Sequence, residues 1–129
     1  MSVFTNIING TIPCYKIMED ENFIAFLDIN PIVIGHILVV PKVEVDIFFE
    51  LSDGLLTSIL QFAKPIALAQ KKCIVCNRIG IATIGLEVPH AHLHLVPITT
   101  ANDLNFTRPK LKVEPLQLAA MQKLILEHL

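Results

Sequence analysis

The chain has 129 residues, of which 53% are hydrophobic and 17% are charged, and its formal net charge is −2. This length predicts a single domain, residues 1–129, that can bury a core without disulfides. No apolar run approaches the roughly 18 residues that a membrane span needs, and no basic cluster favours a nucleic-acid polymer as partner. Residues 1–6 lack the basic and apolar pattern of a secretory signal, so we expect a cytoplasmic location.

Turn-forming residues divide the chain into short segments. Gly10 and Pro13 mark a turn after the apolar opening residues, and Asn30-Pro31 marks another. Apolar and β-branched segments between such breaks predict strands. The expected strands span residues 14–18, 23–28, 36–41, 73–82 and 86–97.

Two segments predict helices. Residues 52–72 carry apolar side chains at three- and four-residue steps, with Ser52 as a plausible N-cap. Pro65 should kink this helix, because it removes a backbone hydrogen bond. Residues 115–128 predict a closing helix with proline in its first turn. Strands grouped around one helix, with a second helix last, predict an α+β fold.

Three of the five histidines, His90, His92 and His94, stand at alternate positions. If residues 86–97 form one strand, the three imidazoles project from the same face. The pKa of a free histidine lies near neutrality, which suits proton transfer, nucleophilic attack on phosphorus or metal binding. This row therefore predicts a functional site rather than a packed core.

Cys73 and Cys76 form a CxxC, which is compatible with a redox pair or with half of a zinc site. No second pair of metal ligands lies at a suitable spacing, unless the histidines supply it. Three cysteines without a secretion signal favour reduced thiols and apolar filler.

The segment from His90 to Val96 resembles the His-φ-His-φ-His-φ-φ signature of the histidine triad (HIT) superfamily, where φ is an apolar residue. Residues 4–13, 24–31 and 35–42 also resemble the first half of that family, so that the likeness covers about residues 3 to 97. It implies an antiparallel five-stranded sheet with one main helix and a C-terminal helix. It also implies a homodimer in which two sheets join, with which the apolar excess agrees.

The resemblance implies a nucleotide hydrolase that acts at the α-phosphorus, with His92 as the nucleophile that forms a nucleotidyl-histidine. His94 and His36 would donate hydrogen bonds to the phosphate oxygens and concentrate positive charge there, while His90 would hold the tautomer of the next imidazole. Asp28 would take the ribose hydroxyls. The expected nucleotide-binding set comprises Asp28, Phe4, Phe26, Ile29, Glu87 and Val88. This account requires no metal and no cofactor.

Several positions depart from the family pattern. Many members carry an asparagine with ten residues between it and the first histidine of the triad; Ile79 stands there, and Asn77 has twelve. Glu87 stands where many members have a serine thought to assist protonation of the leaving group, and the usual nearby glutamine is absent. Some members bind structural zinc through an N-terminal CxxC, whereas this chain has Ser2 and Thr5, so we expect no such zinc.

The expected substrate is a purine nucleoside phosphoramidate or a similar nucleotidyl conjugate. A dinucleoside polyphosphate hydrolase or nucleotidyl transferase is the next alternative, followed by a non-catalytic nucleotide-binding module. A metal-dependent hydrolase or oxygenase would also use alternate histidines on a strand, with Glu87 or Glu114 as a further ligand. Metal dependence and the effect of replacing His92 separate these alternatives.

Overall fold

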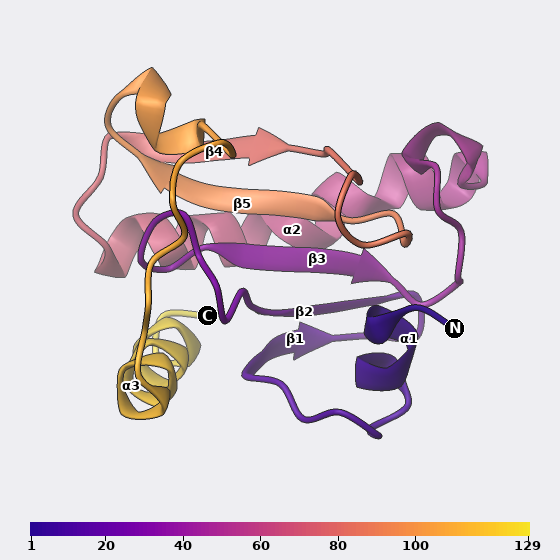
Figure 1. Ribbon diagram of the computed structural model, residues 1–129, viewed down its shortest axis with the longest axis horizontal. Coiled ribbons are helices and arrows are strands. Elements are labelled where there is room, and N and C mark those ends of the chain that lie inside the picture. The colour runs from indigo at the N-terminus through magenta and orange to yellow at the C-terminus, as the bar shows by residue number, and fades with distance from the viewer.

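The computed structural model describes residues 1–129 and contains one five-stranded antiparallel sheet with strand order β1-β2-β3-β5-β4 (Figure 1). The strands span β1 Lys16–Glu19, β2 Phe23–Leu27, β3 Ile37–Pro41, β4 Arg78–Ala82 and β5 Leu93–Ile98. The helices span α1 Val3–Ile8, α2 Asp53–Cys73 and α3 Pro115–Leu126, with short 3-10 turns η1 Phe48–Glu50 and η2 Ala101–Leu104. The α+β prediction and the five antiparallel strands are confirmed.

Alternation along the strands gives the sheet two different faces. Phe23, Ala25 and Leu27 of β2 belong to the main core, together with the buried sides of α2 and α3. Ile24 and Phe26 point to the opposite face, where they pack with α1. Figure 1 shows α2 lying behind the sheet and the segment between η2 and α3 passing in front of it. The front face is therefore the one that remains available for a site.

The long helix begins as its sequence predicts, because the Ser52 side chain accepts a hydrogen bond from the Leu55 N–H. Pro65 lies inside α2 without ending it. The expected strand over residues 73–82 is too long at its start, since α2 continues through Cys73 and β4 begins only at Arg78. Apolar residues at the end of a buried helix look locally like the start of a strand.

The expected strand over residues 86–97 is also wrong in its first half. Residues 86–92 have no regular structure, and β5 begins at Leu93. The Ala91 N–H instead donates to the Val45 carbonyl, outside any ladder. Of the three alternate histidines only His94 therefore lies on a strand, and the row on one face does not form.

No helix in the structure combines the length and the apolar character needed to cross a membrane.

Candidate active site

A pocket of about 690 Å³ opens on the front face of the sheet. Its lining includes His36, His92 and His94 but not His90. It is bounded by α1, the end of β2 with the residues that follow, the loop before the triad, and the segment after η2. The pocket collects side chains that are far apart in the sequence, at the place where the triad enters the sheet.

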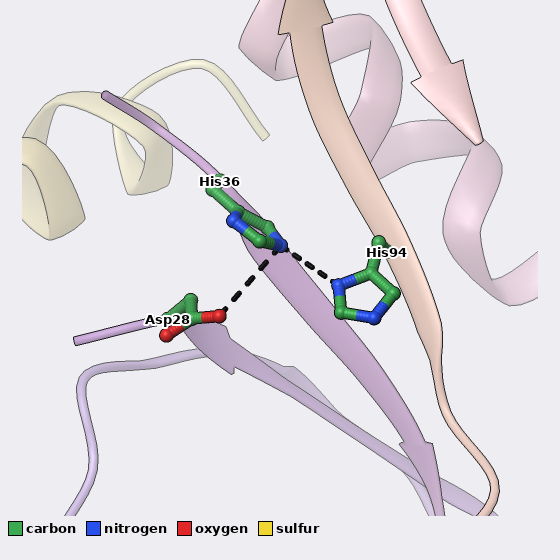
Figure 2. A group of neighbouring side chains, drawn as sticks. All are labelled: Asp28, His36 and His94. Carbon is green, nitrogen blue, oxygen red and sulfur yellow. Dashed lines mark hydrogen bonds and ion pairs between the residues drawn. The ribbon is translucent and has the colours of Figure 1, made fainter. Parts of the chain in front are cut away.

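The sheet register brings His36 and His94 together. His36 stands just before β3, Leu38 pairs with His94 on β5, and His36 is therefore a diagonal neighbour of His94. The Nε2 atom of His36 lies 2.8 Å from the Nδ1 atom of His94 (Figure 2). One ring comes from the residue before β3 and the other from β5, and the two rings share one hydrogen bond.

Backbone contacts fix which nitrogens carry protons in this pair. The Ile32 N–H donates to Nδ1 of His36 at 3.3 Å, so this nitrogen has no proton. The proton of His36 is therefore on Nε2 and is donated to Nδ1 of His94. The proton of His94 must then be on Nε2. His94 is thereby prepared as a hydrogen-bond donor, and His36 acts on it rather than on the pocket directly.

Asp28 completes this group from the end of β2. Its Oδ2 atom lies 3.7 Å from Nε2 of His36 (Figure 2). The Asn30 N–H donates to Oδ1 of Asp28 at 2.9 Å. Burial raises the pKa of the Asp28 carboxyl, and this shift is opposed by the Asn30 hydrogen bond and by Lys110. Asp28 also lines the pocket, where its carboxylate could accept a hydrogen bond from a hydroxyl donor.

His92 is held with one defined tautomer. Its Nδ1 atom lies 2.6 Å from the carbonyl oxygen of His90, so Nδ1 carries the proton and donates it. Nε2 makes no hydrogen bond within the protein and therefore presents a lone pair. The ring is packed edge-on between Phe4, at 5.0 Å, and His94, at 4.8 Å between centroids. The orienting group is the backbone of His90, and not its imidazole as expected.

His90 is fully buried, and both of its ring nitrogens are engaged. Nε2 donates to the Pro41 carbonyl at 2.8 Å, so Nδ1 accepts from the Ser2 hydroxyl at 2.7 Å. Ser2 in turn caps α1 by accepting from the Thr5 N–H. His90 therefore anchors the loop that carries its own carbonyl, and it does not face the pocket.

Burial lowers the pKa of all three pocket histidines. The pKa of His36 and that of His94 fall to about 3, with further lowering by Lys110 and by the neighbouring imidazoles. The pKa of His92 is also lowered by burial. At neutral pH these rings are uncharged. The expectation that His36 and His94 concentrate positive charge is therefore wrong for the free protein, because they are neutral hydrogen-bonding groups.

The expected nucleotide-binding side chains line the same pocket. Phe4 and Phe26 meet edge-on with centroids 5.7 Å apart, and Ile29 and Val88 also line the cavity. Glu87 lies at the mouth and pairs with Lys110, with Oε2 and Nζ 2.9 Å apart. The structure thus brings together every expected site residue except the His90 ring.

Some residues of the site were not predicted. Phe106 packs against His94 with centroids 4.6 Å apart, and Lys110 follows on the same segment. Residues 99–114 show no periodic pattern from which such contacts could be expected. The Gln70 amide donates from α2 to the carbonyls of Gly35 and Leu95, the neighbours of His36 and His94. A polar residue on the apolar face of a helix was the only available signal.

The missing asparagine is not replaced by Asn77. The Asn77 N–H donates to the Ile98 carbonyl at 2.9 Å, at the end of β5 remote from His92. Ile79 packs against the main core instead of the pocket. Nearer the site, the Thr83 hydroxyl donates to the His92 carbonyl at 2.9 Å.

Comparison with known proteins agrees with this geometry. The family model described as the HIT domain matches residues 9–101. This chain belongs to the HIT family. An uncharacterized HIT-like protein of Borreliella burgdorferi is 35% identical over 130 residues, covering 93% of this chain and 94% of that protein. The adenosine 5'-monophosphoramidase HNT1 of Saccharomyces cerevisiae is 37% identical over 98 residues, covering 74% of this chain and 61% of the yeast protein.

A zinc-bound histidine triad family protein from Mycobacterium smegmatis has the same fold. Its crystal structure matches with a TM-score of 0.82 and 28% identity, covering 98% of this chain and 91% of that one. The HIT family is nucleotide-binding and hydrolase-like, and this chain is a member of it. Its pocket contains a cluster of uncharged histidines.

The N-terminal residues do not fit a structural zinc ion. Ser2 and Thr5 occupy the two positions at which some HIT proteins have the cysteines of a zinc-binding CxxC. Hydroxyl groups are not among the usual zinc ligands. Both act instead as hydrogen-bond donors, Ser2 to His90 and Thr5 to Glu44 at 2.5 Å. The Ser2 N–H also donates to Glu44, at 2.6 Å. These hydrogen bonds, together with the packing of Phe4 against His90 and His92, connect α1 to the triad loop.

Asp28, His36 and His94 form a group of three possible metal ligands, one carboxylate and two imidazoles, with their ligand atoms within 4.8 Å of one another (Figure 2). A metal would need a lone pair on Nε2 of His36. The Ile32 N–H places the proton on that nitrogen. The group therefore fits a proton-ordering role better than it fits metal ligation.

Cys73 and Cys76 are unpaired and half-buried, and burial raises the pKa of the Cys73 thiol. Neither belongs to a group of metal ligands. A raised thiol pKa disfavours the reactive thiolate.

Proposed function

We propose that this HIT protein hydrolyses a purine nucleoside phosphoramidate, or a similar nucleotidyl conjugate, through a covalent nucleotidyl-histidine on His92. The observation that carries the proposal is the tautomer of His92. Its Nδ1–H is held by the His90 carbonyl, and its Nε2 lone pair is left facing the pocket. Burial lowers the pKa of this ring, which keeps the nucleophile unprotonated at neutral pH.

The first step is in-line attack of Nε2 of His92 on the α-phosphorus. The bond between Nε2 of His92 and phosphorus forms as the bond between phosphorus and the leaving nitrogen breaks. The leaving nitrogen keeps the bonding electron pair, takes a proton from solvent and departs as a neutral amine. His92 becomes an imidazolium whose Nδ1–H stays on the His90 carbonyl, which spreads the developing positive charge. Water then attacks the same phosphorus and the bond to Nε2 breaks. One proton of the water passes to solvent, the nucleoside monophosphate is released and His92 returns to its neutral state.

His94 stabilises the reacting phosphate in this proposal. Its Nε2–H is fixed by the hydrogen bond from His36 to Nδ1, and a fixed donor requires no reorganisation as charge develops. His36 is a positioning residue, because its polar atoms are engaged by Ile32 and His94. A phosphate at this place would also favour the protonated form of His94 relative to the free protein.

The nucleoside would occupy the rest of the pocket. Phe4, Phe26, Ile29 and Val88 provide apolar walls for a purine, and the Asp28 carboxylate can accept hydrogen bonds from ribose hydroxyls. The phosphoramidase relative supports the choice of an adenosine derivative. Dinucleoside polyphosphates are the second candidate class, favoured by the single lysine at the mouth of the pocket.

A homodimer and a cytoplasmic location belong to the same proposal. The edge strand β4 pairs only with β5 in the single chain, which leaves its outer edge available to a second copy. Sedimentation or size-exclusion analysis at several concentrations tests the dimer.

The direct test is hydrolysis of adenosine 5'-phosphoramidate by the wild type and by His92→Ala, each with a chelator present. We expect turnover that resists the chelator and is abolished in His92→Ala, while His128→Ala, at the far end of α3, keeps wild-type activity. Turnover that survives in His92→Ala refutes the covalent mechanism. Turnover that requires metal moves the histidines from nucleophilic chemistry to ligation.

A further inference from the structure

One cation faces the pocket. Among the residues that line it, Lys110 is the single lysine or arginine, and Asp28 and Glu87 are the carboxylates. The three histidines are neutral because burial lowers their pKa. In the free protein, Lys110 is therefore the cationic side chain of the pocket lining.

Lys110 lies on the segment between η2 and α3, which passes in front of the sheet (Figure 1). The Leu111 N–H on this segment donates to the Pro31 carbonyl at 2.8 Å, and Phe106 packs on His94. The backbone on either side of Lys110 is thus fixed against the site. The long side chain extends from this segment to Glu87 in the loop before the triad, and both residues line the pocket.

The in-line geometry of the proposed attack places the leaving group at the mouth of the pocket. In an in-line displacement the leaving group departs on the side opposite the nucleophile. His92 lines the pocket and is 5% exposed, so that the side of the pocket away from its ring is the more open one. Glu87 and Lys110 occupy that opening, with side chains 74% and 36% exposed.

Lys110 can exchange its ion pair with Glu87 for an ion pair with a phosphate. Exposed ion pairs contribute little to stability because water solvates both partners well. A phosphate oxygen can replace the carboxylate as acceptor, and ammonium–phosphate contacts are strong, charge-assisted hydrogen bonds. A neutral amine leaving group has no negative charge to bind Lys110, so the Glu87–Lys110 ion pair stays intact.

We propose that Lys110 leaves Glu87 and binds the first phosphate of an anionic leaving group, so that it selects nucleotidyl conjugates whose leaving group carries phosphate. Glu87 competes for the same ammonium and repels that phosphate. Lys110 is thus a specificity residue, and the inference rests on the proposed attack by His92.

The test compares two substrates that differ in the charge of the leaving group. Diadenosine triphosphate releases ADP, and adenosine 5'-phosphoramidate releases ammonia. For Lys110→Gln we expect kcat/KM to fall about tenfold for the triphosphate, the effect of one lost charged contact, and to change by less than about twofold for the phosphoramidate. Glu87→Gln should raise kcat/KM for the triphosphate relative to kcat/KM for the phosphoramidate.

The matched control is Lys112→Gln, which removes the same charge from an exposed position outside the pocket on the same segment. It should leave the ratio of the two kcat/KM values unchanged. An equal loss on both substrates in Lys110→Gln, or an equal change of the ratio in Lys112→Gln, overturns the inference.

Binding of ADP and AMP separates this inference from the proposed function. If the wild type cleaves neither substrate, the proposed hydrolysis fails, but the affinity ratio still reports on Lys110. Isothermal titration should show that Lys110→Gln reduces the preference for ADP over AMP by about tenfold. The same preference in wild type and Lys110→Gln would show that Lys110 does not contact the second phosphate.

Discussion

Acid should destabilise this fold through the buried pair His36 and His94. The pKa of each is lowered to about 3 in the folded chain, against about 6.5 in an unfolded chain. The unfolded state therefore binds more protons below pH 6.5, so the free energy of unfolding falls as the pH falls. Between pH 6.0 and 5.0 each histidine removes about 1.2 kcal/mol, and the pair removes about 2.4 kcal/mol.

Urea unfolding at several pH values measures this loss, and His36→Leu isolates half of it. The loss between pH 6.0 and 5.0 should shrink by about 1.2 kcal/mol in His36→Leu, whatever the absolute stability of the variant. His128 contacts the Leu124 carbonyl and not the pair. In His128→Gln, the part of the loss of unfolding free energy that comes from His36 and His94 should therefore equal that of the wild type. A free energy of unfolding that is flat over this range, or a slope unchanged in His36→Leu, would refute the buried, neutral pair.

Three substitutions test the supports of the site. Ser2→Ala should lower the free energy of unfolding by about 2 kcal/mol, because it removes the cap of α1 and leaves Nδ1 of buried His90 unpaired; thermal unfolding measures it. Gly35→Ala should cost about 1 to 2 kcal/mol in the same assay, since φ is +88° and the added Cβ would lie 2.3 Å from Cδ1 of Ile74. Gln70→Met should cost about 1 to 2 kcal/mol and also lower kcat, because two carbonyls beside the catalytic rings lose their donor. Wild-type unfolding curves for these variants would contradict the roles assigned to the three side chains.

The central strands could be predicted from the sequence because their signals are local. Residues 23–27 and 37–41 are continuous apolar runs between turn residues, which is the pattern of fully buried strands. They form β2 and β3, respectively. The Ser52 cap and the apolar steps that follow it gave the start of α2 equally well. In these elements local preference and burial agree.

The entry of the triad into the sheet could not be predicted in this way. Residues 86–92 alternate like a strand, yet long-range hydrogen bonds hold them elsewhere, from Ala91 to Val45 and from His90 to Pro41. The six-residue helix α1 is also too short to show a period, and it depends on the Ser2 cap and on burial of Phe4. Tertiary contacts decide the structure of both segments.

The sequence was enough to predict which residues line the candidate site, but not which contacts they make. The resemblance indicated His92, His94, His36 and Asp28 correctly as pocket residues. It did not indicate that His90 acts through its carbonyl, since that depends on the path of an irregular loop. Lys110 lies in a segment without periodicity, and only its position in the fold relates it to the pocket.

Trapping the covalent intermediate tests the central claim most directly. The wild type would be mixed with adenosine 5'-phosphoramidate, quenched in alkali within the first turnover, digested and analysed by mass spectrometry. The account predicts an adenylyl group on the peptide that contains the triad, attached to His92 and absent from His92→Ala. Turnover without any adduct, or an adduct on His90 or His94, would contradict it.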